Sequence, residues 1–348
     1  MESMHLTTLY YIFGSALTVS LIMIPPIAKL SARFGGIDRP DDRKVHSGDT
    51  PRLGGIAIFC AFLFPVLFFV DINAQVKAFL SGAVLIFLTG LADDLTSLKP
   101  WHKLLGETAA ATIAIVSGGL WVTTLGNPLG LGEIALGHFA IPFTIIAAVG
   151  LINAINMIDG LDGLAGGILA VACLAFAVIS WQVGNYLLIS IIIALLGAIV
   201  GFLPYNSYPA RIFMGDSGSL LLGYCMALCS ILLLNNSHGR VSPVTPLIIL
   251  AVPTIDTLVV MISRLIKGHN VSIPDKSHLH HRILNLGFGH KVAVILIYGL
   301  SGFLSVIAVI FSNVSDFILF WPLTLFFTLF YALLSRMAPL YIFNALGK

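Results

Sequence analysis

Two adjacent aspartates, Asp93 and Asp94, stand where an apolar segment ends in the stretch GLADDL. Like charges on neighbouring side chains repel each other, and a divalent cation or a basic partner is the usual remedy. The pair could equally be two solvated acids that cap the end of a helix. The motif alone is therefore compatible with cation or phosphate chemistry without requiring it.

Oxygen-bearing side chains recur every three residues in the stretch NAINMIDGLDG, at Asn153, Asn156, Asp159 and Asp162. On a helix this spacing would align the four side chains along one face. Amide and carboxylate oxygens suit a hard cation such as Mg²⁺, and this stretch has no Cys or His to favour zinc. Its glycines would let the backbone approach a ligand closely. The alternative is a plain turn between two spans, which would not need such regular spacing.

A single carboxylate, Asp216, lies between small residues in RIFMGDSGS, just before another apolar segment. Small neighbours leave room for a metal ion and a phosphate to approach the backbone N–H groups at the start of a helix. The pattern is weak in isolation. It gains weight if Asp216 lies on the same side of the membrane as the other aspartates.

Three histidines and an arginine gather in SIPDKSHLHHRIL, at His278, His280, His281 and Arg282. Histidines this close together are typical of a zinc site. Beside an oxygen-rich site, however, they more economically donate hydrogen bonds to phosphate oxygens. We therefore favour anion binding over a zinc site or a solvated loop.

Taken together, the four motifs indicate a Mg²⁺ site for pyrophosphate chemistry at a membrane surface. Magnesium usually bridges phosphates with the help of a few carboxylates, and cationic side chains stabilise the charge that develops on a leaving group. A lipid phosphate keeps its charged head at the membrane surface. An acceptor confined to the membrane can meet a soluble donor only there.

The elements that must position these residues are membrane spans. The 348 residues are 58% hydrophobic and 10% charged, whereas a soluble domain has about 25% charged residues. Apolar runs of about 20 residues, enough to cross a hydrocarbon layer, recur from end to end. We predict an all-α, polytopic integral membrane protein that forms a single domain over residues 1–348. About eleven spans are expected, at 7–30, 53–71, 78–92, 104–124, 138–153, 164–182, 186–203, 217–235, 243–264, 291–312 and 317–336.

Lysine and arginine predict the orientation of these spans. If the spans alternate, the motif-bearing loops share one side with almost all of the positive residues, and only Lys77 and Arg240 lie on the other. Positive residues near span ends favour the cytoplasm. We therefore expect cytoplasmic catalytic loops, an N-terminus outside and a cytoplasmic C-terminus. The net charge of +2 gives no reason to expect a nucleic-acid partner.

The motifs, in this order between about residues 30 and 290, resemble those of the polyprenyl-phosphate N-acetylhexosamine-1-phosphate transferases, glycosyltransferase family 4. HLHH at 278–281 is similar to the signature of the bacterial undecaprenyl-phosphate N-acetylglucosamine-1-phosphate transferases, whereas the peptidoglycan branch carries HHHFE. The resemblance implies UDP-N-acetylglucosamine (UDP-GlcNAc) and undecaprenyl phosphate as substrates. It also implies UMP as a product and the bacterial cytoplasmic (inner) membrane as the location, where the reaction would initiate a cell-surface glycopolymer.

Carried over motif by motif, the resemblance also implies roles for individual residues. Asn156 and Asp216 would contact Mg²⁺, with Mn²⁺ as an alternative ion, and Asp93 and Asp94 would serve the reacting phosphates. Lys103, in DDLTSLKPWHK, would approach those phosphates. The substrate-binding set would comprise Asn153, Asp159, Gly160, Leu161, Asp162, Gly163, His278, His280, His281, Arg282 and a basic residue before PRLGG, either Lys44 or His46.

Several alternatives stay open at this point. The donor could be another UDP-N-acetylhexosamine, a homodimer is possible, and Asp256 inside the ninth span could be functional or a buried acid bonded to a neighbouring helix. A cation-coupled transporter is the main alternative class, although the acids lie in loops and no repeat is visible. A CDP-alcohol phosphotransferase is disfavoured because Gly166 and Gly167 stand where its DGxxAR pattern needs Ala and Arg. We favour direct attack by the lipid phosphate over a covalent phosphoaspartate.

Overall fold

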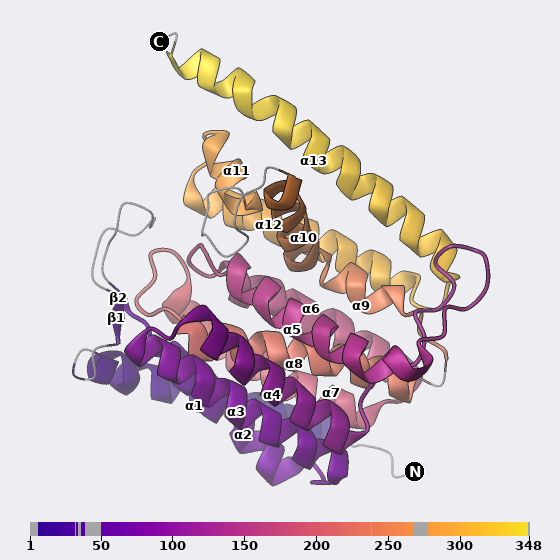
Figure 1. Cartoon of the computed structure of the whole chain (residues 1–348). Coiled ribbons are helices and arrows are strands. Elements are labelled where there is room, and N and C mark those ends of the chain that lie inside the picture. Colours follow the sequence, from indigo (N-terminus) through magenta and orange to yellow (C-terminus); the bar gives the residue numbers. More distant parts are fainter. Residues whose placement is uncertain are drawn as a thin grey trace.

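The computed structural model describes residues 6–31, 33, 36–38, 50–237, 239–266 and 278–346, with side chains described as far as residue 334. Helices dominate this part of the chain (Figure 1). A short antiparallel ribbon pairs β1 (Ile37–Asp38) with β2 (Thr50–Pro51). The helices are α1 (Leu6–Ser31), α2 (Gly54–Phe69), α3 (Ala74–Thr96), α4 (Pro100–Gly118), α5 (Ala140–Ile158), α6 (Leu164–Val183), α7 (Tyr186–Asn206), α8 (Gly215–Asn236), α9 (Val244–Ile249), α10 (Ala251–Ile266), α11 (Leu279–Asn285), α12 (His290–Ile310) and α13 (Asp316–Leu346), with a 3-10 turn η1 (Gly137–Phe139) before α5.

Membrane-spanning length and apolar composition are present in eight helices of the described residues. A polytopic, all-α membrane protein is therefore confirmed. Ten of the eleven predicted apolar segments each fall on one helix, and the segment 243–264 falls on two, α9 and α10. The eight helices do not include α2, which has 16 residues, nor α4, α9 and α10. The count of eleven spans and their orientation stay predictions.

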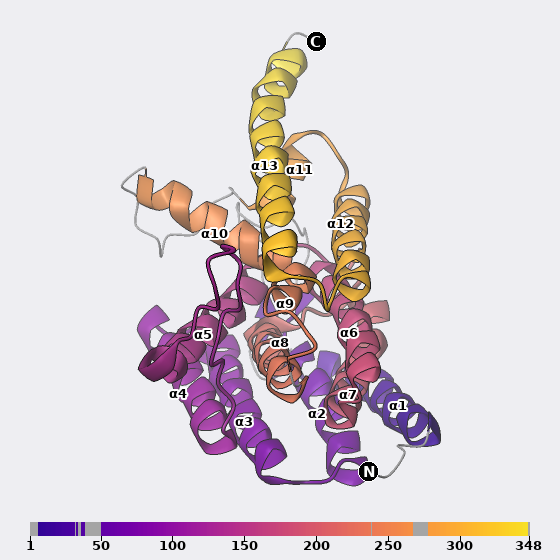
Figure 2. The same ribbon diagram turned by 90° about the vertical axis from the view of Figure 1, so that its right-hand side faces the viewer.

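The centre of the bundle is α8, whose apolar stretch is 89% buried. It packs against α3 and α5, with α2, α6 and α7 also in contact (Figure 2). Without a hydrophobic driving force between helices in lipid, close packing and interhelical hydrogen bonds hold such a bundle together. One such bond is donated by the buried hydroxyl of Tyr224 on α8 to the Phe79 carbonyl of α3, at 2.7 Å. The central position of α8 fixes the residues at its ends relative to the surrounding helices.

The segment 243–264, which we predicted as one span, is broken into α9 and α10 at Leu250. Pro253 explains the break because proline has no N–H to donate to the carbonyl four residues earlier, and its ring clashes with that carbonyl. In Figure 2, α10 leans away from the bundle while α9 continues beside α8. The prediction of one continuous span was wrong here.

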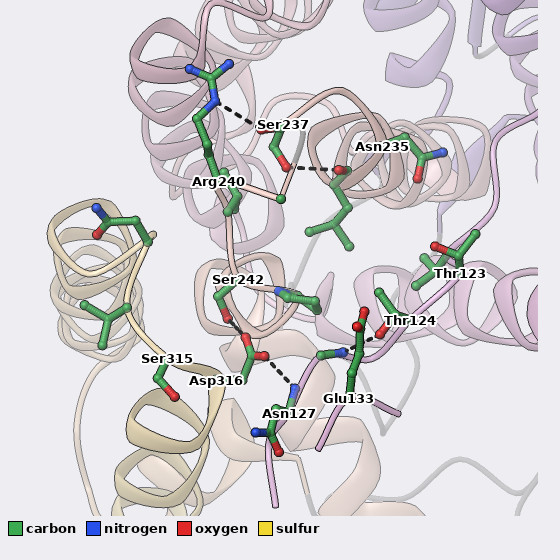
Figure 3. Close-up of a pocket in the computed structure, with 18 of the residues that line it drawn as sticks. Thr123, Thr124, Asn127, Glu133, Asn235, Ser237, Arg240, Ser242, Ser315 and Asp316 are labelled. Atoms are coloured by element: carbon green, nitrogen blue, oxygen red, sulfur yellow. Dashed lines mark hydrogen bonds between the residues drawn. The ribbon is translucent and has the colours of Figure 1, made fainter. Parts of the chain in front are cut away.

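Loops of the bundle gather at two opposite ends. At one end lie the α3–α4, α5–α6 and α7–α8 connections together with α11, and these carry the four sequence motifs (Figure 1, left). At the other end, an open cavity of about 800 Å³ is lined by the α4–α5, α8–α9 and α12–α13 loops. Asp316 joins these loops by accepting hydrogen bonds from the Asn127 N–H, at 2.6 Å, and from the Ser242 hydroxyl (Figure 3).

Candidate active site

A lysine between two aspartates forms the centre of the motif-bearing end. Nζ of Lys103, in the first turn of α4, lies 3.3 Å from Oδ2 of Asp93 on α3 and 3.0 Å from Oδ2 of Asp216 on α8. Pro100 begins α4 in the position that suits proline, because the first helical N–H has no intrahelical partner. The other Asp93 oxygen accepts a hydrogen bond from the Leu98 N–H at 2.6 Å. Two stretches that are distant in sequence, DDLTSLKPWHK and RIFMGDSGS, thus meet in one ion cluster.

Asn156, near the end of α5, joins this cluster. With its amide nitrogen turned toward α8, it donates to Oδ1 of Asp216 at 2.8 Å, and its oxygen accepts from Nζ of Lys103 at 3.1 Å. This orientation gives each amide atom a partner of the correct kind. Asn156 and Asp216, the two predicted Mg²⁺ ligands, therefore lie side by side, and their role as metal ligands stays a prediction.

The carboxylate of Asp94 has different surroundings from that of Asp93. Asp94 is 3% exposed and accepts hydrogen bonds from the backbone N–H groups of Asp216, at 2.8 Å, and Ser217, at 2.9 Å. These groups belong to the first turn of α8, where helical N–H groups lack intrahelical partners. Gly215 has a φ of 67°, and a Cβ there would lie 2.6 Å from the Asp94 carboxylate. Asp94 therefore holds the start of α8, and with it Asp216, in place.

The aligned row of four side chains predicted for NAINMIDGLDG was wrong in its second half. Asn153 and Asn156 lie on α5, but the helix ends at Ile158, and Asp159 is its C-terminal cap. A turn follows, and Oδ2 of Asp162 accepts a hydrogen bond from the Ala210 N–H at 2.9 Å. The helix ends because the glycine-rich stretch that follows favours a turn.

Gly163 closes this turn by two contacts. Its N–H donates to the Asn206 side chain at 3.1 Å, and its carbonyl accepts from the Tyr298 hydroxyl at 2.5 Å. Asn206 and Tyr298 come from α7 and α12, and neither was in the predicted site. The predicted substrate-binding turn 159–163 is thus held from three directions, with Leu161 buried beneath it.

Asn153 points toward α4 instead of the ion cluster. Its amide donates to Oε2 of Glu107, which is 1% exposed, and to the Val149 carbonyl at 2.9 Å. The sequence did contain a signal for Glu107, since a carboxylate inside an apolar run is a functional suspect. The substrate-binding role of Asn153 stays a prediction, and the observed contact links α4 to α5.

Negative charge exceeds positive charge around the cluster. Burial, and then the nearby charges of Asp216, Asp162 and Asp94, raise the pKa of Asp159 to about 7. Among the described residues, no group of three or more His, Cys, Asp and Glu side chains could hold a metal by itself. Asp216 with Asn156 supplies a carboxylate and an amide oxygen, which fits Mg²⁺ because this ion usually takes one or two protein carboxylates and completes its shell with substrate phosphates and water. The same donors do not fit zinc.

The histidine motif lies beside the 159–163 turn. His280 on α11 is 2% exposed, and a Cβ on Gly160 would overlap its Nε2 atom. Burial, and then the charge of His281, lower the pKa of His280 to about 3, so this ring is neutral at physiological pH. His278 is buried as well, whereas His281 and Arg282 are partly exposed. A solvated loop does not describe His278 and His280, so a cationic contact to phosphate would be made by the partly exposed His281 or Arg282. The guanidinium of Arg282 lies 5.5 Å from the Tyr331 ring centre.

The predicted basic residues Lys44 and His46 lie outside the described residues. Arg52, which follows them in PRLGG, does have a described contact, because its guanidinium donates to the Asp94 carbonyl. This arginine was not in the predicted site. It supports the end of α3 on which both aspartates stand.

An apolar groove of about 430 Å³ runs beside the site between α5, α8, α9 and α10. One of its lining residues, Ala154 on α5, stands between Asn153 and Asn156 in the sequence. Leu247 and Leu258, which also line it, have exposed side chains. The break between α9 and α10 contributes Leu250 to its wall. The groove therefore offers an apolar surface that begins close to the ion cluster.

Comparison with known proteins gives consistent matches. The family model described as glycosyl transferase family 4 matches residues 76–234. The chain is 39% identical over 300 residues to the probable undecaprenyl-phosphate N-acetylglucosaminyl 1-phosphate transferase of Bacillus subtilis (strain 168), covering 86% of this chain and 83% of the relative. It is 35% identical over 301 residues to the decaprenyl-phosphate N-acetylglucosaminephosphotransferase of Mycolicibacterium smegmatis (strain ATCC 700084 / mc(2)155), covering 77% and 73%. It is 32% identical over 310 residues to the undecaprenyl-phosphate alpha-N-acetylglucosaminyl 1-phosphate transferase of Escherichia coli (strain K12), covering 86% and 83%.

Proposed function

The chain belongs to glycosyl transferase family 4, and from that premise we propose that it transfers N-acetylglucosamine 1-phosphate from UDP-GlcNAc to undecaprenyl phosphate. The products are undecaprenyl-diphosphate-N-acetylglucosamine and UMP. The names of the relatives from B. subtilis and E. coli contain both undecaprenyl phosphate and N-acetylglucosamine, which supports both substrates. The relative from M. smegmatis is named for decaprenyl phosphate, so assays should compare decaprenyl phosphate with undecaprenyl phosphate as the acceptor.

The observation that carries this proposal is the ion cluster of Lys103 with Asp93 and Asp216. An oxygen of the lipid phosphate attacks the β-phosphorus of the donor, and the bond from that phosphorus to its bridging oxygen breaks as UMP leaves. A phosphate monoester has a second pKa of about 6, so the acceptor is mostly dianionic at neutral pH and needs little help from a base. Asp93 orients the acceptor or takes its residual proton, and Lys103 balances charge that develops on phosphate oxygens.

Mg²⁺ is the cofactor in this proposal, with Mn²⁺ as an alternative. Asp216 and Asn156 are the residues that would hold it, because a carboxylate and an amide oxygen are the ligand types this ion prefers. The Asn156 amide, whose nitrogen donates to Asp216 in this structure, would turn its oxygen toward the ion. When bound, the ion would neutralise charge on the pyrophosphate. Asp94 keeps Asp216 in position by accepting a hydrogen bond from its backbone N–H.

The two substrates have separate places around the cluster. The 159–163 turn and α11 form the donor side, with Arg282 as its cation. The apolar groove beside Ala154 suits the polyprenyl chain, because apolar surface next to a polar cluster matches an amphiphile whose phosphate heads its chain. A bulky substitution in the groove, such as Ala154→Phe, should raise the KM for the lipid more than that for UDP-GlcNAc.

We also place the catalytic end on the cytoplasmic side of a bacterial inner membrane, with about eleven spans, the N-terminus outside and the C-terminus in the cytoplasm. Positive residues support this orientation because they cluster at that end. In the described chain, Lys29, Arg33, Arg52, Lys99, Lys103, Arg211, Arg264, Arg282 and Lys291 lie on helix ends or loops of the catalytic end, and Lys77 and Arg240 on those of the opposite end.

A donor panel tests the function directly. The purified protein in nanodiscs with undecaprenyl phosphate and Mg²⁺ is given UDP-GlcNAc, UDP-GalNAc or UDP-glucose, and UMP release is measured. UMP should appear with UDP-GlcNAc and depend on the lipid. Faster UMP release with UDP-GalNAc would identify UDP-GalNAc as the donor and leave the family assignment unchanged. Lipid-independent release, or none with any donor, would contradict the proposal.

A further inference from the structure

Asp256 on α10 is a carboxylate buried at the junction of three helices. It is 1% exposed. Its Oδ2 lies 2.9 Å from Nδ1 of His278, and its Oδ1 accepts from the Leu279 N–H at 2.8 Å and from the Tyr331 hydroxyl at 3.0 Å. His278 and Leu279 begin α11, and Tyr331 belongs to α13. The buried acid bonded to neighbouring helices, one of the two alternatives raised by the sequence, is thus what the structure contains.

Both oxygens of Asp256 are already used by these partners. A buried carboxylate is tolerated only when hydrogen bonds replace its lost hydration. Nδ1 of His278 and Oδ2 of Asp256 share one proton in this contact, because one of the two groups must donate. With both oxygens engaged inside the protein, Asp256 can affect the reaction only through the residues that it holds.

The element held by Asp256 has little stability of its own. Helix α11 has seven residues, far fewer than the roughly 12 to 15 that an isolated helix needs in water. Asp256 bonds the side chain of its N-cap residue, His278, and the backbone of its first helical residue, Leu279. One residue further along, His280 presses against Gly160 in the turn that we assign to the donor. A shift at the start of α11 would therefore move the wall of the donor side.

We infer that Asp256 is a positioning residue that sets the affinity for the nucleotide-sugar donor by fixing the start of α11, and with it His280, against the 159–163 turn. This inference rests on the proposed function. It assigns Asp256 no contact with substrate. It also predicts that donor affinity changes while lipid affinity does not, because Thr254, Leu258 and Met261 of α10 line the groove for the lipid chain and Asp256 does not.

Steady-state kinetics of Asp256→Asn, His278→Asn and Tyr331→Phe in the intact protein test this inference. Asp256→Asn keeps the size of the side chain and removes the charge, and His278→Asn removes the same contact from the other side. Tyr331→Phe is the matched control, because it removes a hydrogen bond to the same carboxylate but leaves both α11 contacts. We expect the KM for UDP-GlcNAc to rise about tenfold to hundredfold in the first two variants, the range for loss of one charge-assisted hydrogen bond. Tyr331→Phe should stay within about threefold of wild type, which is less than the loss of one such bond.

The double variant Asp256→Asn/His278→Asn separates positioning from general damage. If the two residues act through one contact, the double variant should resemble the single ones instead of multiplying their effects. A KM for UDP-GlcNAc that is unchanged in His278→Asn, an equal rise in the KM for undecaprenyl phosphate, or multiplied effects would overturn the inference. Since wild-type turnover is measured first, an inactive wild type would count against the proposed function and not against the role of Asp256.

Discussion

The adjacent aspartates give the sharpest test of the site geometry, because substitution of Asp94 should mainly reduce stability and substitution of Asp93 should mainly reduce turnover. Asp94→Asn turns an NH₂ group toward one of two backbone N–H donors at the start of α8. One charge-assisted bond, worth about 1.5–3 kcal/mol, is lost and one buried donor is left unsatisfied at a cost of about 1–3 kcal/mol. We therefore expect the free energy of unfolding to fall by about 2.5–6 kcal/mol.

Asp93→Asn should cost much less stability. Its amide oxygen can still accept from the Leu98 N–H, and Lys103 keeps its ion pair with Asp216. We expect a loss of about 1 kcal/mol or less, together with reduced turnover that recovers as pH passes the second pKa of the acceptor phosphate, about 6.

Thermal unfolding of both variants in one detergent, with turnover measured at several pH values, makes the comparison. Equal losses of stability in the two variants would refute the reasoning. So would an Asp94→Asn protein with wild-type stability, because then the carboxylate would not be holding α8.

Other predictions concern charge, metal and the opposite end of the bundle. Asp216→Asn should lower Mg²⁺-dependent kcat about hundredfold or more, because a lost metal ligand is worth several kcal/mol and each 1.4 kcal/mol is about tenfold in rate; a loss under about fivefold would contradict the ligand role. Burial raises the pKa of Asp159 in the folded protein to about 7 from 3.8, so folding favours its protonated form. The stabilisation from this protonation is fully present below about pH 4 and is lost as pH rises through about 7. Melting temperatures without divalent cations should show this fall, and Asp159→Asn should remove it. Gly126→Ala should destabilise the protein by about 1–3 kcal/mol with kcat unchanged, because Gly126 has a φ of 71° and a Cβ there would overlap the Asp316 carboxylate. An unchanged melting temperature would contradict the role of Asp316 in joining the loops at this end.

Helix positions and the convergence of the motifs were predictable from the sequence. Apolar runs of spanning length are set by the bilayer, and the motifs fall at the ends of such runs. Parity of the spans placed Asp93, Asp159 and Asp216 on one side, and the structure brings their helix ends together. The resemblance to a family is confirmed by the comparisons.

Roles that depend on a partner from another helix were not predictable. Nothing in the letters of GLADDL says that one carboxylate meets Lys103 while its neighbour caps α8, because the choice depends on how α3 and α8 pack. The neutral state of His280 likewise follows from burial against Gly160. The break at Leu250 did have a local signal in Pro253, which the length of the apolar run obscured.

The most direct measurement of the central claim follows the donor's β-phosphorus. UDP-GlcNAc labelled there is incubated with the purified protein and Mg²⁺, first without and then with undecaprenyl phosphate. We predict no label on the acid-denatured protein without lipid, and, with lipid, transfer of the label to the organic phase in equal amount to the UMP released. Stoichiometric label on the protein as UMP appears would contradict direct attack, and label that stays in water while UMP is released would contradict transfer to the lipid.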